Sequence, residues 1–342
     1  MSNNLLQKSA HTFQDFTPFS VWHHFIPNEH IVAENDETIL ATDIREEPLY
    51  VQEVDSDFIK LMNDGFFTYK FNNVSNPKNI NDLKNIQELN QDDPWLVNQR
   101  KLIQGQLDGI NSEKTIFSNV FSAITLFKWA LVSDLGAESL PLGDKIFTDL
   151  YLENPAVVTH ALEIINQDIK KQIKISSDAG VDGIFFSTQE IQDSRLDKEF
   201  FLNVQKRLDS ELIEDINENF KTGILHICGF AGAKNRLTWF TDYNLPIINW
   251  ATKFDGLSFR EGQKLFKDKT IFGGLGNTTN DILYNGSQIE IETEIDRILD
   301  EVGTENVLIG ADCTVPRDTP VEHILWARDA AHSYLSRKEK RA

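Results

Sequence analysis

Short segments rich in β-branched and aromatic residues recur along the chain, and longer segments with apolar residues at helical spacing separate them. This alternation predicts a (β/α)8 TIM barrel that occupies residues 1–342 as one domain. The predicted strands are Ser20–His23, Phe66–Phe71, Thr115–Phe121, Gly183–Ser187, Gly223–Cys228, Ile247–Ala251, Thr270–Leu275 and Val307–Asp312. The predicted helices are Val54–Asn63, Pro155–Ala179, Asp197–Phe220, Glu290–Val302 and Pro320–Leu335.

The segment GILHICG (223–229) carries the strongest chemical signal in the sequence. Residues two apart in a strand share a face, so His226 and Cys228 point the same way at the end of the predicted fifth strand. In a barrel of this kind, the carboxyl ends of the strands hold the active site. An imidazole and a thiol on one face are two typical ligands of zinc.

The second cysteine of the chain, Cys313, follows the predicted last strand. With His226 and Cys228 it would complete a His/Cys/Cys set, the three-ligand pattern of a catalytic zinc site with an open fourth position. Two thiolates favour zinc over a hard, oxygen-preferring ion. Free cysteines are also common as small buried apolar residues, and the sequence leaves this alternative open.

The overall composition excludes several classes of function. The chain has 53 Asp and Glu residues against 33 Lys and Arg, a formal net charge of −20, which is unsuited to nucleic acid or to an anionic membrane surface. No run of 18 apolar residues is present, so we expect no membrane span. Two cysteines cannot form a disulfide framework, and we therefore expect a cytoplasmic protein.

Polar and aromatic residues at other predicted strand ends are candidates for substrate contact: Ser187, Asn249, Trp250, Asn277 and Asp312. Capping of a strand end, bracing of a turn or ordinary packing would equally explain several of them. A fourth metal ligand could come from Asn249, Asp312 or the His23/His24 pair, or from water. Adjacent strand residues face opposite sides, so at most one of the two histidines is expected in the barrel mouth.

Four segments resemble the uroporphyrinogen decarboxylase superfamily: DAGVDGIFFS (178–187), LHICG (225–229), GGLGN (273–277) and LIGADCTVPRDTPVEHI (308–324). Within it, the chain is most similar to zinc-dependent methyltransferases of the methylcobamide:coenzyme M type. The resemblance implies that His226, Cys228 and Cys313 bind Zn²⁺ and are catalytic. It also implies transfer of a methyl group from a corrinoid on a carrier protein to a small thiol. Asp-x-His-x-x-Gly, the corrinoid-binding signature, is absent from this sequence.

The true decarboxylases of this superfamily differ at their working positions. Their Arg-Gln-Ala-Gly-Arg motif after strand one is replaced here by VWHHFIPNEH (21–30), and their late Gly-His-Gly by Ala311-Asp312-Cys313. Without the arginines, a polyanionic porphyrinogen lacks its usual clamp. A cofactor-free lyase and a non-catalytic corrinoid- or porphyrin-binding barrel stay as alternatives. The thiol, the methyl donor and the oligomeric state, for which a homodimer is one option, are left open.

Overall fold

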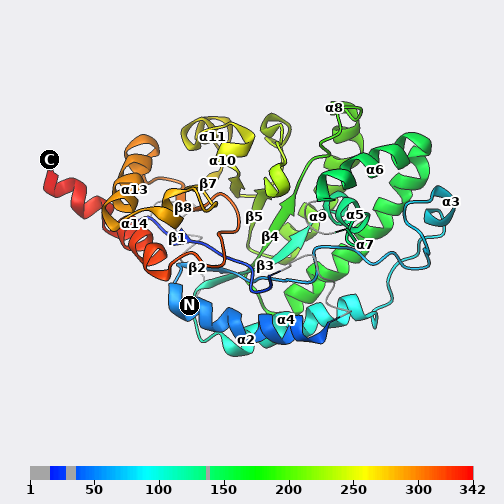
Figure 1. The fold of residues 1–342 in the computed structure, drawn as a ribbon, viewed down its shortest axis with the longest axis horizontal. Coiled ribbons are helices and arrows are strands. Elements are labelled where there is room, and N and C mark those ends of the chain that lie inside the picture. The colour runs from blue at the N-terminus through cyan, green and yellow to red at the C-terminus, as the bar shows by residue number, and fades with distance from the viewer. Residues whose placement is uncertain (1–15, 28–35, 136–138, 342) are drawn as a thin grey trace.

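The computed structural model describes residues 16–27, 36–135 and 139–341. Eight parallel strands form a sheet in the order β1-β8-β7-β6-β5-β4-β3-β2, with helices packed around it (Figure 1). The fold is a (β/α)8 barrel of the type that the alternating sequence pattern predicts. The strands are β1 Phe19–Ser20, β2 Phe58–Lys60, β3 Thr115–Phe121, β4 Gly183–Thr188, β5 Thr222–Ile227, β6 Ile247–Trp250, β7 Thr270–Leu275 and β8 Val307–Ala311.

The helices pack on the outside of the barrel (Figure 1). The α-helices are α2 Glu37–Val54, α3 Ile80–Leu83, α4 Pro94–Gly109, α5 Ala123–Ala130, α6 Leu140–Glu153, α7 Pro155–Ala179, α8 Lys198–Phe200, α9 Lys206–Asn219, α10 Thr252–Asp255, α11 Phe259–Leu265, α12 Ile282–Asn285, α13 Gln288–Val302 and α14 Val321–Arg341. A π-helical turn, η4 Phe201–Gln205, joins α8 to α9, and two 3₁₀ turns, η5 Phe230–Gly232 and η6 Leu237–Trp239, follow β5. Among the described residues, no helix is long and apolar enough to cross a membrane.

The barrel closes between its first two strands without a regular ladder. The backbone N–H of Asp57 donates to the carbonyl of Phe19 at 2.9 Å, and the Ser20 hydroxyl donates to the carbonyl of Phe58 at 2.8 Å. Below the mouth, aromatic rings fill the interior: Phe58 packs edge-on against both Phe117 and Phe272. The interior is thus a packed core, and space for a ligand is confined to the carboxyl ends of the strands.

The second strand lies where the sequence pattern predicts a helix. Helix α2 ends at Val54 because Asp55 adopts a left-handed conformation (φ 51°), and β2 follows at once. The predicted helix Val54–Asn63 is therefore wrong, and so is the predicted strand Phe66–Phe71, which forms a loop. Phe67 in this loop is buried against Phe121. The loop is therefore rich in aromatic residues because it packs over the barrel, and not because it forms a strand.

Candidate metal centre

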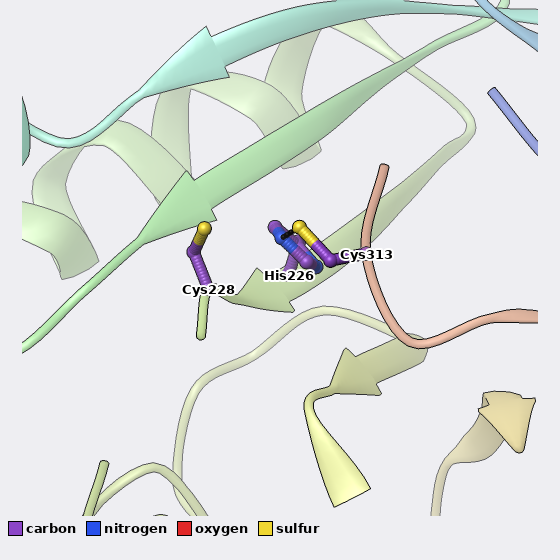
Figure 2. A group of neighbouring side chains, drawn as sticks. All are labelled: His226, Cys228 and Cys313. Atoms are coloured by element: carbon purple, nitrogen blue, oxygen red, sulfur yellow. Dashed lines mark hydrogen bonds between the residues drawn. The ribbon is translucent and has the colours of Figure 1, made fainter. Parts of the chain in front are cut away.

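The three candidate ligands meet at the mouth of the barrel. His226 lies near the end of β5, Cys228 follows that strand directly, and Cys313 lies two residues beyond β8. All three side chains are buried. Figure 2 shows the Cys313 thiol directed at the His226 ring, with the Cys228 side chain beside them. Strands that are distant in sequence thus bring all three groups to one place.

The spacing of the ligand atoms is compatible with one small ion. One ligand atom from each of the three residues lies within 4.8 Å of the others, and Cys313 Sγ is 3.6 Å from His226 Nε2. Bonds of about 2.3 Å to sulfur and about 2.0 Å to nitrogen in a tetrahedron place sulfur and nitrogen about 3.5 Å apart. The donor set and this distance therefore fit zinc, with small movements of the thiols.

Asn249 on β6 determines which nitrogen of His226 is available. Its Nδ2 donates to the carbonyls of Phe272 (2.9 Å) and Ala311 (3.2 Å), so its Oδ1 must be the atom that bonds His226 Nδ1. An acceptor at that position requires the proton on Nδ1 and leaves the Nε2 lone pair facing the thiols. Metal-binding histidines are typically oriented by such a partner on the second nitrogen.

Backbone contacts hold Cys228 after its strand has ended. Its N–H donates to the Thr188 carbonyl at 2.8 Å, and its carbonyl accepts from the side-chain amides of Gln189 (3.1 Å) and Asn235 (3.0 Å). The N–H of Phe230 donates to the Cys228 sulfur at 3.4 Å. The thiol is therefore presented by a rigid segment, as a site with fixed geometry requires.

The two thiols differ in acidity because they contact one another. Hydrogen bonding between them holds the pKa of Cys313 well below its usual range. The same contact, together with burial, raises the pKa of Cys228. Thiols bind a metal ion as thiolates, so metal binding at this pair would release protons.

Two adjoining cavities open on this centre. The inner one, of about 40 Å³, is lined by the three candidate ligands and mostly by aromatic residues, among them Trp22, Phe121 and Trp129. The outer one, of about 340 Å³, shares the walls formed by His24 and Cys313. A small group can reach the ligands in the inner cavity, and a larger molecule can occupy the outer one.

The profile of the family described as "Uroporphyrinogen decarboxylase (URO-D)" matches residues 69–334, well over half of the chain. This chain belongs to the uroporphyrinogen decarboxylase family. The match includes all three candidate metal ligands, whereas the cavity-lining residues Trp22, His24 and Lys60 precede the matched range. No curated protein matches the sequence.

Solved structures agree with the fold of the uroporphyrinogen decarboxylase family. A methyltransferase from Methanosarcina mazei superimposes with a TM-score of 0.70 at 14% identity, over 98% of each chain. A B12-independent methionine synthase from Shewanella sp. W3-18-1, in complex with selenomethionine, gives a TM-score of 0.51 at 13% identity, over 96% of this chain and 100% of that one. At these identities the similarity establishes the shared barrel fold.

The structure separates the five predicted substrate contacts of this family member. Ser187 lines the inner cavity, and its hydroxyl donates to Asn119 Oδ1 at 3.1 Å. Asn277 lines the outer cavity, where its Nδ2 donates to the Thr314 carbonyl at 3.0 Å. Asn249 lies behind His226 and faces neither cavity. Only Ser187 and Asn277 of the five are therefore within reach of a ligand in these cavities.

Asp312 and Trp250 lie away from the cavities. The Asp312 carboxylate accepts from the N–H of Gly274 at 3.1 Å and from the N–H and hydroxyl of Thr252, so it fixes the backbone ahead of Cys313. Burial raises its pKa to about 7. Trp250 points outward into the layer under the helices, where its indole donates to the Leu257 carbonyl at 3.0 Å and stacks on Phe259. The prediction that Trp250 lies at the barrel mouth is therefore wrong. The adjacent residue Asn249 points inward, and neighbouring residues of a strand point to opposite faces.

The adjacent histidines after β1 diverge, as the alternation argument predicts. His24 lines both cavities, and its Nδ1 lies 2.6 Å from Asp64 Oδ1. His23 turns away and packs against Tyr50. Burial lowers the pKa of His23.

Sequence reasoning missed Lys60, the last residue of β2. Its side chain is only 7% exposed and lines the inner cavity with the candidate ligands. Burial lowers its pKa to about 8, although the nearby thiols and the carboxyl groups of Glu47 and Asp64 oppose this shift. The residue could have been found only after placing the second strand correctly, because its inward direction follows from alternation within that strand.

Proposed function

We propose that this protein is a zinc-dependent methyltransferase that moves a methyl group from a corrinoid (methylcobamide) on a carrier protein to a small thiol. The observation that carries the proposal is the convergence of His226 Nε2 and two buried thiols at the open end of a barrel. Three protein ligands that leave one position open are typical of catalytic zinc, whereas structural zinc sites have four.

The chain's own residues have separate roles in this proposal. His226, Cys228 and Cys313 would hold the ion, and Asn249 keeps the imidazole in the binding tautomer. Bound zinc would lower the pKa of an incoming thiol and so favour the nucleophilic thiolate at neutral pH. The aromatic residues that line the inner cavity would limit the access of water to the reacting sulfur, and the outer cavity would admit the methyl group of the carrier. The solved relatives named as a methyltransferase and a methionine synthase support transfer of a one-carbon group.

Decarboxylation, the activity in the family's name, is the competing function. The described residues that line the inner cavity include no arginine, and Lys60 is their only lysine. The outer cavity adds Arg317. A substrate with many carboxylates needs several such cations to offset its desolvation. The mouth of this barrel thus suits a small thiol better than a porphyrinogen.

Metal analysis of the purified protein tests the proposal. We expect about one zinc per chain in the wild type and well under half of that in Cys228→Ala and Cys313→Ala. The loaded wild type should also consume methylcobalamin, a free methyl donor, in the presence of a thiol panel. Wild-type protein without zinc, or a cysteine variant with full zinc, would refute the site. Turnover of uroporphyrinogen by zinc-free protein would favour the lyase instead.

A further inference from the structure

Lys60 places a positive charge inside the barrel mouth. It lies two residues after Phe58, whose ring contacts Phe272 inside the barrel, so alternation directs both side chains inward. The Lys60 Nζ lies 4.9 Å from the ring centroids of both Trp22 and Phe185. Its one hydrogen bond in the described structure is donated to Met62 Sδ at 3.3 Å. A thioether is a weak acceptor, so most of the ammonium's hydrogen-bonding capacity is unused.

The acids nearest to Lys60 are engaged elsewhere. Asp64 accepts from the ring of His24 and from the N–H groups of Phe25 (2.8 Å) and Ile26 (3.1 Å). Glu47 accepts from the N–H of Met62 at 2.8 Å, and burial raises its pKa to about 8. Within the described part of the chain, Lys60 forms no salt bridge. A buried ammonium without a directly bonded anion is costly, and the nearby thiols and carboxyl groups offset this cost only in part, because burial still lowers its pKa. An anion that arrives with the substrate would supply the missing contact.

Charge counting identifies this partner. A divalent ion bound by two thiolates and a neutral imidazole carries no net charge. An acceptor thiolate at the open position then adds one negative charge in a buried cavity, and Lys60 supplies one positive charge on the wall of the same cavity. For the ion, its three ligands, Lys60 and the acceptor taken together, the charges sum to zero only if the thiolate is the acceptor's sole charge.

We propose that Lys60 pairs with the acceptor thiolate and that the acceptor is a small thiol whose remaining body is uncharged, of the alkyl or aryl class. This inference rests on the proposed function and extends it to the substrate class. The walls around Lys60 agree with an apolar body, since Met62, Phe67 and Phe121 line the same cavity. A carboxylate or sulfonate on the acceptor would add a second negative charge. The described residues of the inner cavity hold no second lysine or arginine to meet it, and Arg317 lines the outer cavity instead.

Thiol binding to the Co²⁺-loaded protein tests the inference without relying on turnover, because thiolate coordination to cobalt is visible in the absorption spectrum. The matched probes are 1-propanethiol and 3-mercaptopropionate, which have the same chain length and similar thiol acidity, titrated anaerobically. We expect 1-propanethiol to bind at least about tenfold more tightly in the wild type. In Lys60→Met its binding should weaken by at least about tenfold, whereas Lys60→Arg should retain most of it. Lys234→Met, at an exposed lysine on the neighbouring rim, should change nothing.

The possible outcomes distinguish failure of the Lys60 inference from failure of the proposed metal site. Tighter binding of 3-mercaptopropionate that is lost in Lys60→Met would overturn the inference, because Lys60 would then recognise an anionic substituent. Unchanged propanethiol binding in a folded Lys60→Met protein would also overturn it. Failure of the wild type to bind Co²⁺ would instead refute the proposed metal site itself. If Lys60→Met does not fold, the preference of the wild type between the two thiols still decides the question.

Discussion

Asn249 gives the most direct test of how the barrel prepares the candidate metal centre. The substitution Asn249→Ala removes three hydrogen bonds at a fully buried position: one to the His226 ring and two to the carbonyls of Phe272 and Ala311. Each buried carbonyl left without a donor costs about 1–3 kcal/mol. We therefore expect the free energy of unfolding of the metal-free protein to fall by about 2–5 kcal/mol.

The same substitution should weaken zinc binding. Without Asn249 Oδ1, the imidazole loses the acceptor that holds the proton on Nδ1 and fixes the ring plane. Loss of such a partner typically reduces metal affinity by 10–100-fold, or about 1.4–2.7 kcal/mol. Asn249→Asp keeps the acceptor oxygen and removes the two donors. It should lose comparable stability and retain most of the zinc affinity, which distinguishes orientation of His226 from general destabilisation.

Two measurements check this prediction. Zinc affinity is obtained by competition with a chelator of known affinity, and stability by urea unfolding in the presence of EDTA. Asn217→Ala is the matched control, because its Nδ2 makes one exposed hydrogen bond, to the Asn244 carbonyl at 2.9 Å. That control should stay within about 0.5 kcal/mol of the wild type. A folded Asn249→Ala protein with zinc affinity within twofold of the wild type would refute the role assigned to Asn249.

Two further predictions concern buried charges away from the candidate metal centre. Lys128→Met should lower the free energy of urea unfolding by about 3–5 kcal/mol, because it leaves the buried Asp144 carboxylate without the ammonium now 2.9 Å away; an unchanged midpoint would contradict this. Burial raises the pKa of Asp209 to about 7, so the folded protein binds a proton more tightly than the unfolded chain between about pH 4 and pH 7. Stability should therefore fall as pH rises through that interval. In Asp209→Asn, the fall in the free energy of unfolding over this pH interval should be smaller by up to about 4 kcal/mol. An equal fall in both proteins would exclude Asp209 as the source of the pH dependence.

Local signals in the sequence were sufficient to predict the bounds of several helices and strands of the barrel. Helix α7 begins at Pro155 after a capping Asn154 and ends at Ala179, where the next residue, Gly180, adopts a left-handed conformation, so both of its ends are encoded by neighbouring residues. Strands β3 and β7 also have the predicted bounds. Strand β2 escaped prediction because its three residues are too few for an alternating pattern, and the buried segment around it contains apolar residues at helical spacing.

In the candidate site, too, relations within one strand were predictable from the sequence, and relations between strands were not. Alternation within one strand predicted that His226 and Cys228 share a face, since that relation is local. The meeting of Cys313 with them depends on barrel closure. Likewise, the register between β5 and β6 pairs Asn249 with His226, so Asn249 shares the inward direction of His226. Its neighbour Trp250 therefore points outward.

The sequence by itself determined the repeating strand–helix order, the strand ends at which chemistry was to be sought, and the two thiols and one imidazole available for a metal. Only the tertiary structure decided that these three groups converge, that Asn249 orients the imidazole, and that a buried lysine faces them. The physical reason is that periodicity and capping act between residues a few positions apart. Distances across a barrel mouth depend on the register of every strand and on the packing that closes the sheet.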